Sequence, residues 1–255
     1  MTDPRFANTG PKKTKKKKEK AGFIKSIKEL AGSKYLACLA IMVLAYGISI
    51  NLVEVTWKHN LKVLFEGDKK GFFGFQGTVM TLTGLVTIVF LWFGTGNVLR
   101  KFGWYVAALF TPFMLLITAL IFFANLTFVD LLVGVAATIG ATPLLLVAWA
   151  GGIQNILSKS TKYSFFDPTK EMAYIPLDEH TKRTGKAAID GVGGRLGKSG
   201  GSLVNMILIA ILGSVEAMTP FIAVITLGII ILWIFCVGIV NKEFIALNKQ
   251  QENNS

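Results

Sequence analysis

Polar and charged residues recur at helical spacing on one face of an otherwise apolar segment. Gly47, Asn51, Glu54 and Lys58 lie at i, i+4, i+7 and i+11, which places them on one side of a helix. A carboxylate within an apolar helix is costly to bury and usually faces a bundle interior or a water-filled path. The stripe therefore predicts a binding or translocation role for Glu54. In the alternative interpretation, Glu54 lies at the end of the helix, pairs with Lys58 and only anchors the helix.

A second stripe near residue 200 is cationic. Its members, at i, i+4, i+7, i+11 and i+14, are Gly191, Arg195, Lys198, Ser202 and Asn205. Cations flanked by glycines, which let helices approach closely, indicate an anion path between packed helices. The same spacing also fits a second interpretation, in which Arg195 and Lys198 extend to the membrane surface and fix the orientation of the helix.

The sequence lacks the residue patterns that a metal site or a P-loop nucleotide-binding site requires. His59 and His180 have no neighbouring ligand types, so we expect no metal site. The run GKS at 197–199 resembles the end of a P-loop, but that motif needs a glycine where the chain has Val192, and no strand precedes it. We therefore expect no cofactor and no enzymatic activity, and we look to binding and translocation instead.

Long uncharged windows separate these charged groups. Hydrophobic residues make up 52% of the 255 residues, and charged residues 16%, against roughly 25% in ordinary soluble domains. Six windows contain no Asp, Glu, Lys or Arg: Tyr35–Val53, Gly71–Leu99, Phe102–Val129, Leu131–Ser158, Ser199–Val215 and Ala217–Asn241. A membrane-crossing helix needs about 20 apolar residues. The sequence therefore predicts an all-α membrane protein with six transmembrane helices, the fifth borrowing residues from its N-terminal flank.

The distribution of basic residues predicts the orientation. With six spans, 23 of the 27 Lys and Arg residues fall on one side, which is then the cytoplasmic side. The net charge of +12 therefore does not indicate nucleic acid as a partner, since a basic stripe on a folded soluble face is missing. We predict a basic cytoplasmic linker or tail at 1–32, a six-span domain at 33–241 and a cytoplasmic tail at 242–255.

Residues 159–198 form a predicted cytoplasmic segment between spans four and five. Asp167 and Pro168 resemble a helix N-cap followed by proline at the first helical position. Pro176 then interrupts the chain, and a new helix is expected from about Asp178, more than 30 residues long if it continues into span five. Two further prolines, Pro112 and Pro143, fall within predicted spans, where they would kink the helices.

Three contiguous runs carry a family resemblance: YGISINLVEVTWK at 46–58, QNILSKSTKY at 154–163 and FDPTKEMAYIPLDEHTKRTGKAAIDGVGGRLGKSGG at 166–201. The chain resembles the ATP/ADP translocases, or nucleotide transporters, of chlamydiae, rickettsiae and plastids. The resemblance implies a major-facilitator-type fold of twelve spans in two halves, of which this chain matches the C-terminal half. Residues 2–6 (TDPRF) resemble the start of the linker between the halves.

The resemblance also implies roles for individual residues. The important intramembrane glutamate of the family falls on Glu54 and its important lysine on Lys198. Lys198, with Arg195 or Lys58 as second candidates, would supply positive charge to nucleotide phosphates. Glu54 would balance a basic residue or exchange ion-pair partners as access alternates. Asn155 and Lys159, four residues apart, are further candidates for the same path.

The resulting expectation is the C-terminal half of an antiporter that exchanges ATP for ADP and that requires an N-terminal half. The resemblance implies phosphate as a further substrate, since it accompanies ADP in some family members. Membrane lipid and the second half are the expected partners. A bacterial inner membrane, with both termini cytoplasmic, is the expected location because the resemblance has a chlamydial character. Two alternatives stay open: a transport-inactive remnant, and a homodimeric carrier of small anions.

Overall fold

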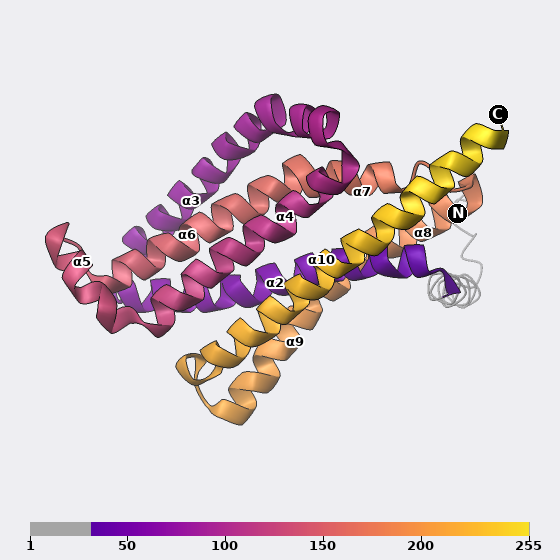
Figure 1. Ribbon diagram of the computed structural model, residues 1–255. Helices are drawn as coiled ribbons and strands as arrows, with labels where there is room; N and C mark the ends of the chain where they lie inside the picture. Colours follow the sequence, from indigo (N-terminus) through magenta and orange to yellow (C-terminus); the bar gives the residue numbers. More distant parts are fainter. Residues whose placement is uncertain (1–31, 255) are drawn as a thin grey trace, which may run out of the picture.

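The computed structural model describes residues 32–254, and every regular element in this range is helical (Figure 1). In chain order they are α2 (Lys34–Leu64), α3 (Lys69–Val89), η2 (Phe90–Thr95), α4 (Gly96–Thr127), η3 (Val129–Leu131), α5 (Leu132–Thr138), α6 (Pro143–Thr161), η4 (Lys162–Phe166), α7 (Asp167–Ala173), α8 (Glu179–Ala188), η5 (Ile189–Gly193), α9 (Gly194–Leu212) and α10 (Val215–Asn254). The all-α prediction is confirmed for these residues. The basic segment predicted at the N-terminus lies outside them, apart from Gly32.

Several helices have a polar N-cap residue whose side chain accepts a hydrogen bond from a backbone N–H of the first turn. These N-caps, on α2, α3, α6 and α8, are Ser33, Asp68, Thr142 and Asp178. Such caps satisfy amides that have no partner within the helix. Hydrogen bonds from the side chain and the backbone amide of Thr181 hold the pKa of Asp178 below its usual range. The predicted helix start at Asp178 is therefore confirmed.

Among residues 32–254, four helical stretches are long and apolar enough to cross a membrane: Lys34–Leu64, Lys69–Thr127, Glu179–Leu212 and Val215–Gln250. A fifth candidate is the pair Val129–Thr138 and Pro143–Ala173, which is bent by 101°. The stretch Glu179–Leu212 joins α8, η5 and α9 over 34 residues, as expected for the helix that follows Pro176. The last helix, α10, continues beyond the predicted span to Asn254.

Three predictions about the middle of the chain are wrong. The window 131–158 is not one helix, because the chain turns after α5 at Gly140, whose φ of 67° suits glycine. Pro143 consequently occupies the first turn of α6, where its missing N–H costs nothing, and does not lie inside a helix that it could kink. Asp167 does not begin a separate helix either, since α6 continues through η4 into α7 without a break. Pro112 does lie inside α4.

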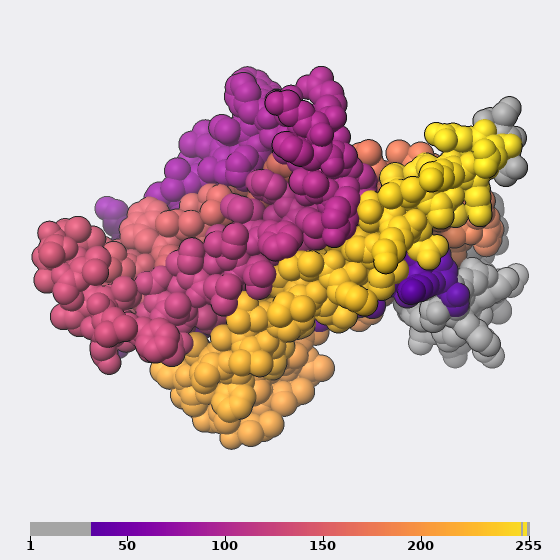
Figure 2. All heavy atoms as spheres, in the orientation of Figure 1, coloured from indigo at the N-terminus to yellow at the C-terminus, as the bar shows by residue number. Residues whose placement is uncertain are grey.

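The bundle is organised around α2. It packs against α10, α9 and α6, while α4 packs against α6 and α10. Figure 1 shows α10 crossing α2, and in Figure 2 α4 and α10 lie side by side across one face of the molecule. Trp57 Nε1 on α2 donates a hydrogen bond to the Ala148 carbonyl of α6 at 2.9 Å, which ties these two helices together in the core.

Much of the outer surface is apolar. Large side chains that are mostly exposed include Phe73, Met80 and Trp92 on the α3–η2 segment and Val224 and Phe235 on α10. An extensive apolar exterior is unfavourable in water and suits contact with lipid tails. The chain therefore has the surface of a multi-pass membrane protein.

One stripe of α2 is left partly open between its neighbours. Most of this helix is buried, but Ile48, Asn51, Glu54, Val55 and Lys58 are only partly covered, at the spacing of one helical face. We call these five residues the open stripe of α2. Both charged residues of the predicted polar face, Glu54 and Lys58, therefore lie on its accessible side.

Candidate functional site

Glu54 is the centre of an ion-pair cluster that joins two helices. Its Oε1 lies 2.8 Å from Lys58 Nζ on the same helix and 3.6 Å from Lys159 Nζ on α6. The side chains of Glu54, Lys58 and Lys159 are 27%, 43% and 32% exposed, so the cluster is neither buried nor fully solvated. We call these three residues the Glu54 cluster.

The Glu54 cluster carries an excess of positive charge. Two ammonium groups share one carboxylate, which gives a formal charge of +1. Partial burial lowers the effective dielectric constant and strengthens each of these interactions relative to bulk water. Such an arrangement can attract an anion, and it can release a lysine if the anion competes with Glu54.

Asn51 connects the open stripe of α2 to α9. Its Oδ1 lies 3.4 Å from both Ser202 Oγ and Asn205 Nδ2, which donate toward it. A Cβ placed on Gly201 would approach the Cβ of Asn51 to 2.8 Å, so only a glycine fits there without displacement. Ser202 and Asn205, two members of the predicted cationic stripe, thus meet the polar stripe of α2.

Two glycines bring the backbones of α2 and α9 into direct contact. A Cβ on Gly47 would lie 2.9 Å from the Gly197 Cα and 3.2 Å from the Lys198 nitrogen. Glycine pairs of this kind allow helices in membranes to pack at close range. The contact fixes Lys198 beside α2.

The two cations of α9 are exposed. Neither Arg195 nor Lys198 forms an ion pair with any residue in the range 32–254. The close contact of α9 with α2 places the backbone of Lys198 beside Gly47, while Lys159 reaches Glu54 from α6. Gly191, the first member of the predicted stripe, is exposed in η5 and no atom would contact its Cβ within 4 Å.

Asn155 lies apart from these residues. It is fully buried within the bundle, and its Nδ2 donates to the Gly151 carbonyl at 3.0 Å. Lys159, one turn later on α6, reaches the open stripe of α2. Of these two residues, only Lys159 contacts the open stripe in this structure, and the common path stays a prediction.

Sequence reasoning missed two residues at this face, Lys162 and Tyr163. They follow Lys159 by three and four residues on a continuous helix, a spacing that signals one face. Asp167 and Pro168 resemble a helix start, which suggests that the helix containing Lys159 ends before residue 167. This interpretation obscures the i+3 and i+4 spacing from Lys159. Lys162 Nζ lies 5.8 Å from the ring centroid of Tyr46 on α2 and 4.5 Å from that of Tyr163.

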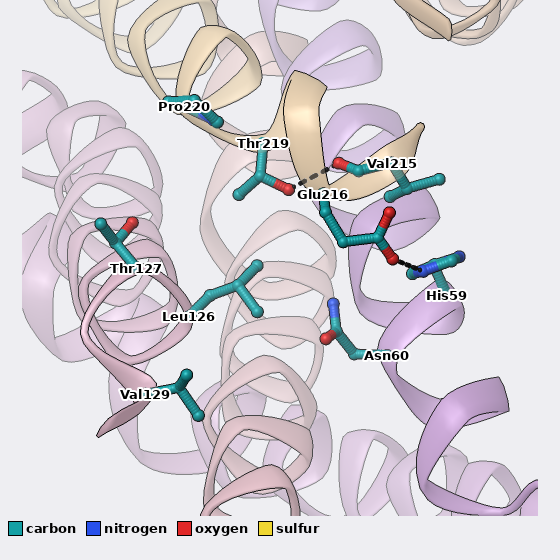
Figure 3. Close-up of a pocket in the computed structure, with 9 residues that line it drawn as sticks. All are labelled: His59, Asn60, Leu126, Thr127, Val129, Val215, Glu216, Thr219 and Pro220. Carbon is teal, nitrogen blue, oxygen red and sulfur yellow. Dashed lines mark hydrogen bonds and ion pairs between the residues drawn. The ribbon is translucent and has the colours of Figure 1, made fainter. Parts of the chain in front are cut away.

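A pocket of about 390 Å³ lies elsewhere, between the ends of α2, α4 and α10 (Figure 3). Four of its five polar side chains bind one another or nearby carbonyls. His59 Nε2 lies 2.6 Å from Glu216 Oε1, Asn60 Nδ2 donates to the Thr56 carbonyl, and Thr219 Oγ1 donates to the Val215 carbonyl. With an acidic residue and no lysine or arginine in its lining, this pocket is a poor site for a polyanion.

The amino-acid sequence of this chain matches a family of known proteins over almost its whole length. Residues 1–244 match the family model described as TLC ATP/ADP transporter. The ADP,ATP carrier protein 1 of Chlamydia muridarum is 49% identical over 252 residues, which cover 99% of this chain and 47% of the carrier. The chloroplastic ADP,ATP carrier protein 2 of Arabidopsis thaliana is 46% identical over 95% of this chain and 39% of the carrier.

The ADP,ATP carrier protein 1 of Rickettsia prowazekii is 42% identical, over 99% of this chain and 51% of the carrier. The chain thus spans about half the length of the curated relatives it matches. No solved structure matches it. On the match of nearly its whole length, the chain belongs to the TLC ATP/ADP transporter family, a family of transporters and not of enzymes.

Proposed function

We propose that this chain forms one half of a nucleotide antiporter that exchanges ATP for ADP by alternating access. The observation that carries the proposal is the cationic face around the open stripe of α2. There the Glu54 cluster and Lys198 lie on a bundle whose remaining exterior is largely apolar. Charged groups at membrane depth are costly and usually mark a substrate path. The relatives named ADP,ATP carrier suggest the class of anion.

Six crossings are part of this proposal. The stretch Lys69–Thr127 has 59 residues, which as one helix would be about 89 Å long, roughly three times the hydrocarbon thickness. At Gly103 its φ is 77°, and Figure 1 shows the chain leaving along α3 and returning along α4. This reversal divides the stretch into two crossings. Counting the bent pair as one crossing then gives six.

An even number of crossings returns the chain to the side on which it started. With 23 of 27 Lys and Arg residues on that side, we place residues 1–32 and 242–255 in the cytoplasm. A bacterial inner membrane is the proposed location, on the strength of the chlamydial relatives, although other relatives are chloroplastic. The proposed architecture is one half of a major-facilitator-type transporter.

In the proposed mechanism, nucleotide phosphates bind the cations that flank the open stripe. Lys58 and Lys159 are held by Glu54, while Lys198 and Arg195 have no carboxylate partner among residues 32–254. Phosphate oxygens compete with Glu54 for the ammonium groups, and release of the nucleotide restores the ion pairs. Because Lys159 belongs to α6 and Glu54 to α2, this exchange of partners couples binding to the contact between two helices. The second half would close the site from the opposite side.

Uptake of radiolabelled ATP by intact bacteria tests the function. The chain is expressed alone or together with the N-terminal part of the Chlamydia muridarum carrier, in cells containing ADP. We expect exchange only when both parts are present, and its loss in Lys198→Ala. Lys101→Ala, which removes an exposed lysine outside this face, serves as the matched control and should retain exchange.

Two other results would refute this assignment. Exchange by the 255 residues alone would indicate a homodimer. Absence of exchange with both parts verified in the membrane would indicate a transport-inactive chain.

A further inference from the structure

Tyr163 is an exposed aromatic residue next to the Glu54 cluster. It is 53% exposed and lies four residues after Lys159, about 6 Å further along the same helix. Lys159 reaches Glu54 of α2, and the Tyr163 ring contacts Lys162, which also lies over the Tyr46 ring of α2. This turn of α6 and η4 therefore faces α2 at both of its ends.

The Tyr163 ring is held in place by its neighbours. Lys162 Nζ lies 4.5 Å from the ring centroid and is itself fixed by Asp167 Oδ2 at 2.6 Å. Behind Lys162, the buried ring of Tyr46 stacks on Phe166 with centroids 5.9 Å apart. One side of the Tyr163 ring is thus supported while the rest of the residue stays accessible.

A π-helical turn sets this position. η4 interrupts the regular helix at Lys162–Phe166, and the Thr95 hydroxyl of η2 donates to the Ser164 carbonyl at 2.6 Å. Phe165 in the same turn packs against Phe90, with centroids 6.0 Å apart. Single π-helical turns within α-helices occur frequently at functional sites. Here the turn is fixed by two contacts to the neighbouring helix.

The charge around Tyr163 differs from that of the Glu54 cluster. Lys162 is neutralised by Asp167, and the nearby Lys170 lies closer to Asp190, at 2.9 Å, than to Asp167, at 4.0 Å. The surroundings of Tyr163 are therefore aromatic and nearly neutral, whereas the Glu54 cluster one turn away has a formal charge of +1. A nucleotide has the same division into a neutral aromatic base and an anionic phosphate chain.

We propose that Tyr163 is the stacking platform for the base of the transported nucleotide, with its phosphates directed toward Lys159 and Lys58. This inference rests on the proposed function and adds to it a subsite for the base. Stacking on an aromatic ring tolerates different bases, because every base has a π-face. Lys162 positions the ring, and Asp167 keeps Lys162 from acting as a phosphate ligand.

The test compares the KM values for ATP and for ADP in cells that express both halves of the transporter. In Tyr163→Leu, loss of stacking raises both KM values by the same factor, roughly tenfold. Tyr163→Trp retains a stacking surface and restores both values. Lys159→Met, which alters the phosphate site, raises the KM for ATP more than the KM for ADP. Tyr105→Leu removes another exposed tyrosine, on α4, and leaves both KM values unchanged.

Four results overturn the inference. Unchanged KM values in Tyr163→Leu, with normal exchange by the unmodified protein, refute the base subsite and leave the transport function intact. Unequal effects on ATP and ADP assign Tyr163 to the phosphates, and a fall in membrane protein level without a KM change assigns it to anchoring. Absence of exchange by the unmodified protein refutes the transport function itself, and this subsite with it.

Discussion

Glu54 forms ion pairs both within α2 and across to α6. Its pairing with Lys58 follows from their i, i+4 spacing and could be predicted from the sequence. Its pairing with Lys159 could not, because it depends on the contact between α2 and α6, which no local pattern encodes. Tyr163 was missed for a related reason: the sequence around Asp167 and Pro168 resembles a helix start, whereas the helix continues through η4.

The first prediction concerns the carboxylate of Glu54. In Glu54→Gln the two lysines lose their counter-charge, and we expect the rate of ATP/ADP exchange to fall about tenfold or more. Initial uptake rates, normalised to the amount of protein in the membrane, measure the effect. Glu216→Gln is the matched control because Glu216 also pairs across helices, with His59, but lies in the separate pocket. Equal losses in the two variants would contradict a specific role for Glu54.

At the scale of the elements, the contact of α2 with α9 determines where Lys198 lies. The glycines at 47, 197 and 201 are visible in the sequence as small residues on or beside the two polar stripes. That they pair across the two helices is not visible in the sequence. Other helical glycines of this chain do not pack in this way: a Cβ added at Gly228, for example, would have no atom within 4 Å. Composition alone does not distinguish a packing glycine from a glycine in open space.

The second prediction tests this contact. Gly47→Ala places a methyl group 2.9 Å from the backbone of Gly197, so the helices must separate. We expect the thermal unfolding midpoint of the purified protein to fall by about 4 °C or more. Gly228→Ala, whose new methyl group meets no atom within 4 Å, should leave the midpoint unchanged or slightly raised, because alanine favours the helix. Similar midpoints for the two variants would show that α2 and α9 are not in close contact.

At the scale of the whole molecule, uncharged windows located most of the candidate spans, because hydrophobic length is the main requirement for crossing a bilayer. They failed at 131–158, where the glycine and proline that divide the window carry no charge. The boundary between the second and third windows is marked by charges at Arg100 and Lys101 and coincides closely with the reversal at Gly103.

The third prediction concerns the six-span topology. With Cys38 and Cys236 replaced by serine, single cysteines are introduced as Lys62→Cys, between the first two crossings, and Lys101→Cys, near the reversal at Gly103. A membrane-impermeant maleimide applied to intact cells should label position 62 and not position 101. After lysis both positions should react. Labelling of position 101 in intact cells would be incompatible with the proposed orientation.

The measurement that tests the central claim most directly is nucleotide protection on the open stripe of α2. Val55→Cys is introduced into the same cysteine-free background, with both halves expressed, and its rate of alkylation is measured with and without ATP. The control variant is Thr219→Cys, in the pocket of Figure 3, which reports any effect of ATP on alkylation away from the open stripe. We predict that ATP and ADP slow alkylation at position 55 and leave position 219 unchanged. Unprotected alkylation at position 55, or protection at position 219 alone, would contradict nucleotide binding at the Glu54 cluster.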